Sequence, residues 1–174
     1  MTYQSKRQIV WGIRILVSTL FILSAVAKLY PSPVMGIASF EAKYLGALGI
    51  DGGYAKVVSR LLIGFELTLA LLMLLPFYLK KIVIPATISL LSVFSIHLLV
   101  QVFNGEASNC GCFGELIPMT PLEALIKNIF TIGLLILPIT AFKDQLEDTK
   151  KINPLLITGL STSLLMFVLL PQGS

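Results

Sequence analysis

Hydrophobic residues gather along the chain in five long runs, at about residues 9–30, 57–79, 82–103, 124–142 and 155–170. A helix needs about 20 apolar residues to cross a bilayer, and the first four runs are close to that length or beyond it. The fifth run is short, so it can cross the bilayer only where the bilayer is locally thinner or where flanking polar residues extend to the membrane surface. The runs are continuously apolar and leucine-rich, which favours helices over alternating strands. The pattern therefore predicts an all-α, polytopic membrane helix bundle of four helices plus a fifth, as a single domain over residues 1–174.

Composition supports this prediction by excluding other classes. Of the 174 residues, 56% are hydrophobic and only 13% are charged. A soluble domain carries about 25% charged residues, and a disordered chain has low hydrophobicity. Two cysteines form one disulfide at most, which excludes a disulfide-rich secreted scaffold. The first run is too long for a cleaved signal peptide, so we expect it to be kept as a membrane helix.

The distribution of basic residues predicts how the bundle lies in the membrane. Seven lysines and arginines flank the runs on one side: Lys6, Arg7, Lys80, Lys81, Lys143, Lys150 and Lys151. The other side has only Lys43 and Lys56. Positively charged loops stay in the cytoplasm, so we expect a cytoplasmic N-terminus and outward-facing segments at residues 31–56 and 104–123. Topology thus accounts for much of the net charge of +4, and nucleic acid is not needed as a partner.

Both cysteines lie in the second outward segment, in the string Asn109-Cys110-Gly111-Cys112-Phe113-Gly114. A disulfide between Cys110 and Cys112 closes a very small ring, and Gly111 permits backbone angles that other residues cannot reach. Strained and accessible disulfides exchange readily, and a bridge this local stabilises little. Reversible thiol–disulfide exchange is therefore the leading interpretation. An inert pair and a metal site are the alternatives at this point.

A second group of polar residues lies within the predicted helices, in the outer half of the bilayer. It consists of Lys28, Arg60, Glu66, His97, Lys127 and Asn128. Intramembrane charges are costly and usually face the bundle interior. We therefore expect Glu66 to pair with Lys28 or Arg60, and Lys28, Glu66, His97 and Lys127 to converge beneath the cysteines. In the simpler alternative, the basic residues extend separately to the membrane surface.

These residues together resemble a known family. The first helix, with Arg14, Phe21, Ser24, Lys28 and Leu29, is similar to the opening of DoxX-type membrane proteins. Glu66 and the Cys-Gly-Cys-Phe-Gly string make the chain most similar to the MauE-like (methylamine utilisation) branch, over about residues 14–142. The resemblance implies a four-helix core in the bacterial inner membrane. It also implies a role in disulfide formation beside a periplasmic thioredoxin-fold protein, and a link to quinone-dependent oxidoreductases.

The leading hypothesis is an inner-membrane thiol–disulfide redox protein in which Cys110 and Cys112 exchange a disulfide with a periplasmic thioredoxin-like or exported thiol protein. The polar pocket then either tunes the thiols or holds an electron carrier such as a quinone. Two other functions remain open. One is binding or transport of a soft metal of the copper or mercury type, because thiolates select such ions. The other is a docking subunit without chemistry. We assign no metal ligands.

Overall fold

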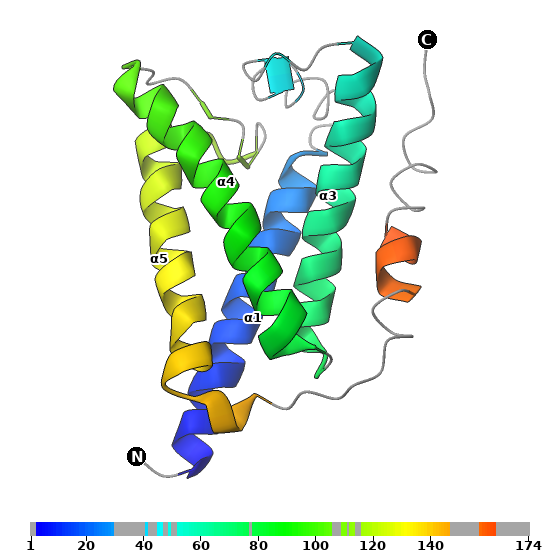
Figure 1. Ribbon diagram of the computed structural model, residues 1–174. Coiled ribbons are helices and arrows are strands. Elements are labelled where there is room, and N and C mark those ends of the chain that lie inside the picture. Colours follow the sequence, from blue (N-terminus) through cyan, green and yellow to red (C-terminus); the bar gives the residue numbers. More distant parts are fainter. Residues whose placement is uncertain are drawn as a thin grey trace.

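Four long antiparallel helices form the body of the protein. They are α1 (Tyr3–Ala27), α3 (Gly52–Leu74), α4 (Ile84–Phe103) and α5 (Pro121–Thr140). The computed structural model describes residues 3–29, 41, 45–46, 49, 52–76, 78–105, 109–110, 112–113, 116–146 and 157–162. Figure 1 shows that the helices run alternately up and down, so the connection from α4 to α5 lies at the end opposite the N-terminus. Each helix is long and apolar enough to cross a membrane, and the described residues contain no strand. The all-α prediction is confirmed.

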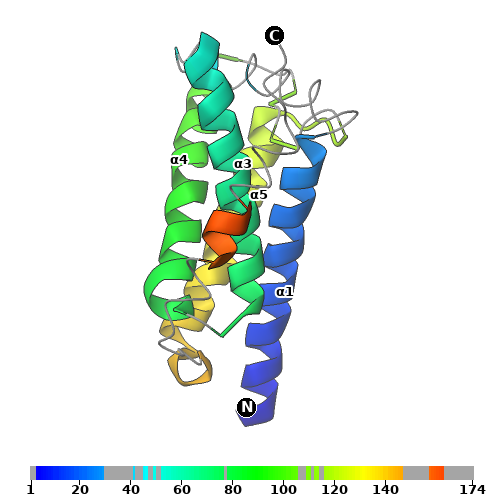
Figure 2. The same ribbon diagram turned by 90° about the vertical axis from the view of Figure 1, so that its right-hand side faces the viewer.

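A fifth, shorter helical segment lies against the outside of α3. Residues 157–162 are helical, and the hydroxyl groups of Thr68 and Thr162 share a hydrogen bond. Both views show this segment beside α3 (Figures 1 and 2). The other residues of the predicted fifth run, 155–156 and 163–170, lie outside the described residues.

Capping and proline residues move the helix ends away from the edges of the apolar runs. The helix α5 begins at Pro121 because Thr120 and Glu123 form a capping box. The Thr120 hydroxyl accepts from the Glu123 N–H at 3.4 Å, while Glu123 accepts from the Thr120 N–H at 2.8 Å. Both bonds satisfy backbone N–H groups that have no partner within the helix at its N-terminus. The helix therefore begins three residues before the predicted start at 124.

The connection between α3 and α4 lies earlier in the chain than the sequence predicts. The helix α3 ends at Leu74, two residues before Pro76, which lacks an N–H group. Tyr78 then adopts a left-handed backbone with φ of 47°. A π-helical turn, η3 (Leu79–Val83), follows and leads directly into α4. Lys80 and Lys81, which the sequence places in the tight turn between the two spans, therefore lie in η3 at the start of the third span.

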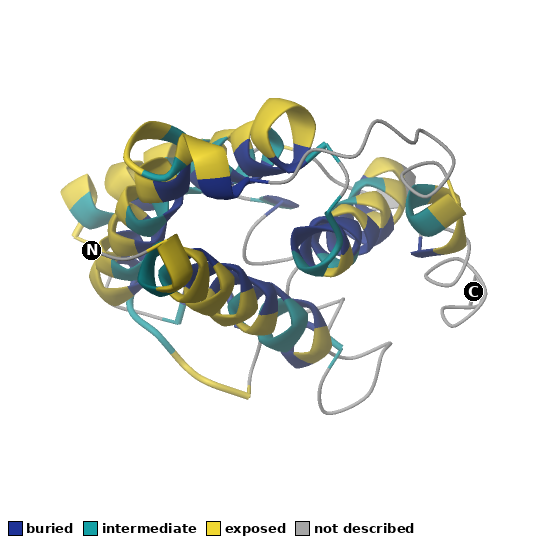
Figure 3. Cartoon of the chain, turned by 90° about the horizontal axis from the view of Figure 1, so that it is seen from below, coloured by how far each residue is buried: buried dark blue, intermediate teal, exposed yellow. Residues whose placement is uncertain are grey.

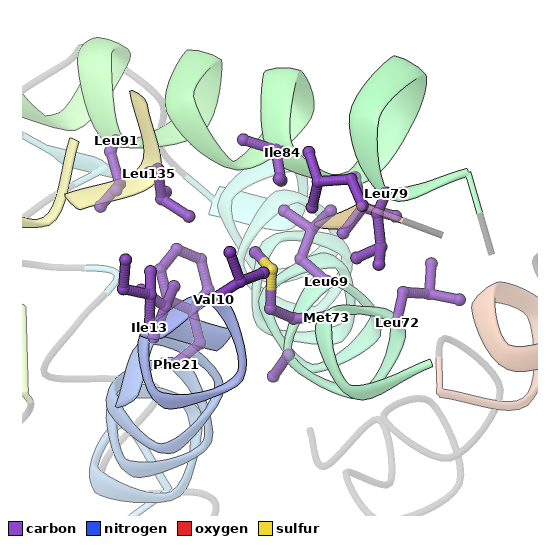
Figure 4. Close-up of a cluster of buried hydrophobic side chains, with 14 residues drawn as sticks. Val10, Ile13, Phe21, Leu69, Leu72, Met73, Leu79, Ile84, Leu91 and Leu135 are labelled. Atoms are coloured by element: carbon purple, nitrogen blue, oxygen red, sulfur yellow. The ribbon is translucent and has the colours of Figure 1, made fainter. Parts of the chain in front are cut away.

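The helices pack in two pairs, α1 with α3 and α4 with α5. A hydrophobic cluster near the N-terminal end joins the pairs, and Figure 4 shows Val10 and Met73 from one pair close to Ile84 and Leu135 from the other. A second cluster lies at the opposite end and includes both cysteines. Seen along the bundle, the exposed positions lie mainly on the outer sides of the helices (Figure 3). Large apolar residues such as Ile96 and Phe130 are 65% and 64% exposed, which is expected of surfaces that face lipid.

Candidate functional site

A buried ion pair joins the first and second spans. Lys28 follows the last residue of α1, and its Nζ lies 2.9 Å from Oε1 and 2.8 Å from Oε2 of Glu66 on α3. The two side chains are only 2% and 4% exposed. Charges this deeply buried need close partners, because their loss of hydration is costly. The predicted pairing of Glu66 with a basic residue is confirmed, and the partner is Lys28.

Ser24 connects this ion pair to the loop that carries the cysteines. Lys28 Nζ donates to the Ser24 hydroxyl at 2.7 Å. Ser24 Oγ in turn lies 3.1 Å from the carbonyl oxygen of Cys112 and 3.4 Å from Glu66 Oε2. The hydroxyl has one hydrogen, so it donates to one of these oxygens at a time, and the carbonyl is the nearer. The cysteine loop, residues 104–120, is thereby fastened to α1.

The two cysteines are thiols in this structure, and both are buried in the hydrophobic cluster at this end of the bundle. The backbone N–H of Cys112 donates to the sulfur of Cys110 at 3.4 Å. The backbone N–H of Cys110 donates to the carbonyl of Met119 at 2.8 Å, which ties together two parts of the same loop. The residues on either side of the central glycine thus have different anchors.

The hydrogen bonds between the two cysteines shift their pKa values in opposite directions. The pKa of Cys110 is lowered to about 7, mainly because the Cys112 thiol donates a hydrogen bond to it. The same hydrogen bond, together with burial, raises the pKa of Cys112 well above its usual range. A thiolate is the nucleophilic form of cysteine. A substantial fraction of Cys110 is therefore in the reactive form at neutral pH.

Lys127 brings a second positive charge to the same region. Its ammonium group lies over the ring of Phe113, with the nitrogen 4.3 Å from the ring centre, which is a favourable cation–π distance. The charge of Lys127 also acts to lower the pKa of both Cys110 and Cys112. Within the part of the chain that the structure describes, no carboxylate lies within ion-pair distance of Lys127.

A small cavity of about 30 Å³ lies where the four helices meet next to Cys112. Its polar lining includes Ser24, Lys28, Glu66, Cys112, Lys127 and Asn128. Asn128 is 2% exposed, and its Oδ1 accepts no hydrogen bond from the described residues. A volume of this size holds one or two water molecules. The site is thus a thiol pair placed over a small polar cavity inside the membrane bundle.

Comparison with known proteins identifies the family. A family model described as methylamine utilisation protein MauE matches residues 6–141. The chain belongs to the MauE family. The matched part contains all the polar side chains that line the cavity, and both cysteines. The MauE branch of the resemblance is therefore confirmed, while the wider DoxX grouping stays a prediction.

The MauE-family chain is also similar to a longer protein. It is 47% identical over 163 residues to a protein named Protein TlpB from Flavobacterium psychrophilum. The aligned part is 92% of this chain and 44% of that relative, so the chain spans less than half the length of the curated relative it matches. No solved structure matches the chain. The family and the four apolar helices together make this a multi-pass membrane protein.

The structure brings together four of the six intramembrane residues that the sequence predicts. Lys28, Glu66, Lys127 and Asn128 line the cavity in this MauE-family protein, whereas Arg60 and His97 do not. Arg60 is six residues from Glu66 on α3, which places it about 120° around the helix. The side chains that α4 contributes to the cavity are instead Leu91 and Phe94. Lys28, Glu66 and Lys127 thus lie at one cavity, and His97 is not among the residues that line it.

Two contacts of the site carry no clear signal in the sequence. Ser24 and Lys28 are four residues apart, which predicts a shared helix face, but the loop carbonyl that accepts from Ser24 has no sequence signature. The ring of Phe113 under Lys127 is likewise set by the fold of the cysteine loop. Both contacts arise where that loop returns onto the helices.

The described residues offer neither a three-ligand metal site nor a cavity of quinone size. Among the residues that the structure describes, no three histidine, cysteine or carboxylate side chains gather as a metal site requires. A quinone ring is larger than one or two water molecules, so it does not fit the cavity in this conformation. Quinone binding here requires the lining helices to separate, and it stays a prediction.

Proposed function

We propose that this MauE-family protein is a thiol–disulfide redox protein of the bacterial inner membrane. The observation that carries the proposal is the position of the Cys112 N–H and thiol as hydrogen-bond donors to the Cys110 sulfur. These donors stabilise a thiolate at neutral pH, and thiolates are the species that attack disulfides. A disulfide between the two cysteines would add little stability to the fold, because a bridge across one residue constrains almost no chain.

The reaction moves two electrons between the pair and a second protein. In one direction the two thiols become a disulfide, and a disulfide of the partner becomes two thiols. In the reverse direction the pair is reduced and the partner is oxidised. The direction follows from the reduction potentials of the two pairs. A periplasmic thioredoxin-fold protein or an exported thiol protein supplies the chemistry that this exchange requires.

The distribution of charge supports an outward position for the cysteine loop. Lys6, Arg7, Lys80, Lys81 and Lys143 all lie at the N-terminal end of the bundle, away from the cysteines. Basic residues that flank membrane helices stay on the cytoplasmic side. The cysteine loop then faces the periplasm, where disulfides form and persist.

A redox titration of the purified full chain tests this function. The protein is equilibrated in thiol–disulfide buffers over a range of potentials, and free thiols are counted by alkylation and intact mass. We expect both thiols to disappear together in one two-electron step, as an intramolecular disulfide forms. Thiols that stay reduced at every potential would contradict the proposal and favour a docking subunit. A tightly bound soft metal that holds both thiols would instead favour a metal-binding protein.

A further inference from the structure

Resting on the proposed function, we infer that the two cysteines have fixed and different tasks. Cys110 is the sulfur that exchanges with the disulfide of the partner. Cys112 is the resolving sulfur, which closes the pair's own disulfide from the side of the membrane cavity. The inference comes from three differences in how the two residues are held, which concern their anchors, their hydrogen-bond donors and their neighbouring charges.

The anchors of the two residues differ. Cys112 is fastened to α1, because its carbonyl accepts from Ser24, and it lines the cavity. The backbone N–H of Cys110 instead donates to Met119 within the loop, and Cys110 packs in the buried cluster without lining the cavity. Both residues are buried, so a partner must displace local contacts to reach either sulfur. Displacing Cys112 breaks its bond to Ser24 of α1, whereas displacing Cys110 together with Met119 leaves the Cys110 bond intact.

The hydrogen-bond donors differ as well. The N–H of Cys112 is directed at the Cys110 sulfur, so the free protein holds its negative charge on Cys110. The hydrogen bond that the Cys112 thiol donates to Cys110, followed by burial and then the Cys110 charge, raises the pKa of Cys112 and so keeps it protonated before the partner arrives. Once Cys110 is joined to the partner, it is no longer an anion. The main obstacle to ionising Cys112 is then removed.

The neighbouring charges favour ionisation of Cys112 at that moment. Lys28 already donates to two carboxylate oxygens of Glu66 and to the hydroxyl of Ser24, which uses all three of its N–H groups. Lys127 places its ammonium group over the ring of Phe113, and it lines the same cavity as Cys112. The charges of Lys28 and Lys127 both act to lower the pKa of Cys112 and so favour its thiolate.

The steps balance as follows when the pair reduces a disulfide. The Cys110 thiolate attacks one partner sulfur, a mixed disulfide forms, and the second partner sulfur leaves as a thiolate. Cys112 loses its proton, which that thiolate takes up, and then attacks the Cys110 sulfur. The Cys110–Cys112 bond forms and the first partner sulfur leaves as a thiolate, which is protonated from water. Two electrons have passed to the partner, and the reverse sequence oxidises a partner dithiol.

The experiment compares Cys112→Ser with Cys110→Ser in the full chain, in detergent or membranes. The probe is an aromatic disulfide that releases a coloured thiolate. These matched substitutions retain a hydroxyl of similar size in the same loop, and a thiol count in denaturant gives one thiol for each. At pH 7 we expect Cys112→Ser to react at least about tenfold faster than Cys110→Ser and to stop at a stable mixed disulfide, because only its remaining sulfur is held as a thiolate.

Three outcomes separate the inference from the proposed function. If the unsubstituted protein releases two equivalents of coloured thiolate and closes its disulfide, the proposed function stands. Equal rates for the two variants, or a faster Cys110→Ser, would then overturn the assignment of tasks alone. If the unsubstituted protein ends with two mixed disulfides and no internal bridge, the proposed function itself fails.

Discussion

Lys28 and Glu66 are 38 positions apart in the chain and meet through two hydrogen bonds of 2.8 and 2.9 Å, enclosed by the four helices. One of these residues follows α1 and the other lies within α3. The pair therefore fixes the relative height of the two helices that carry it. The same ammonium group binds Ser24, so the ion pair also supports the cysteine loop.

Breaking this ion pair is predicted to destabilise the protein strongly. Either Glu66→Leu or Lys28→Met leaves one buried charge without its partner, and we expect each to lower the free energy of unfolding by about 3 kcal/mol or more. The double variant removes both charges and should recover most of the loss. Unfolding in mixed micelles measures all three. A double variant no more stable than the single variants would contradict a pairwise interaction.

Ser24→Ala is predicted to loosen the cysteine loop without breaking the bundle. The lost hydrogen bond is worth about 1 kcal/mol, so alkylation of Cys112 in a Cys110→Ser background should become about fivefold faster. Thr19→Ala is the matched control, because Thr19 donates only to Ile15 of its own helix. Equal alkylation rates in Ser24→Ala and Thr19→Ala would show that Ser24 does not hold the loop.

The proposed topology predicts opposite labelling of the two ends of the bundle. A membrane-impermeant thiol reagent should modify the native cysteines in intact cells after mild reduction. A single cysteine introduced by Lys80→Cys, in a chain with Cys110→Ser and Cys112→Ser, should be modified only after the membrane is permeabilised. Lys80 lies in the turn η3 at the N-terminal end and is exposed there. Labelling of position 80 in intact cells would contradict the proposed topology and place the N-terminal end of the bundle outside the cell membrane.

The sequence predicts the helices well because the bilayer imposes a length and an apolar composition on each span. It predicts their ends less well, since a polar capping box at Thr120 and Glu123 extends α5 beyond its apolar run. The turn at Tyr78 is missed for a similar reason. Its left-handed backbone and the π-helical turn that follows are local geometry, and hydropathy carries no record of them.

Part of the site is predictable from the sequence, because an unpaired charge inside a membrane is energetically costly and charged residues there are expected to pair. That expectation indicated a partner for Glu66 and the convergence of Lys28 and Lys127. Helical spacing tells which residues share a face, but not which way the face turns. This is why His97 was expected at a cavity that α4 lines with Leu91 and Phe94. The bond from Ser24 to Cys112 joins a helix to a loop carbonyl, which no spacing rule describes.

The final prediction concerns the pH dependence of the thiol pair. The pKa of Cys110 is about 7, so its alkylation rate should rise with pH and reach half its maximum near pH 7. The positive charge of Lys127 contributes to this lowered pKa by favouring the thiolate. Lys127→Met should therefore move the midpoint to higher pH, and Lys127→Arg, which keeps the charge, should move it less.

At pH 7 the expected slowing of alkylation in Lys127→Met is about twofold, because a partly screened charge changes the thiolate free energy by only a fraction of a kcal/mol. Lys81→Met serves as the control, because it removes the same charge at the other end of the bundle, beyond effective reach through screening solvent. The pH profiles of the lysine variants are compared in a Cys112→Ser background, so that a single sulfur reports. The midpoint of Lys81→Met should match that of the Cys112→Ser parent. If Lys127→Met and Lys81→Met give the same profile, Lys127 does not act on the cysteines electrostatically. The cavity beneath them would then serve packing alone.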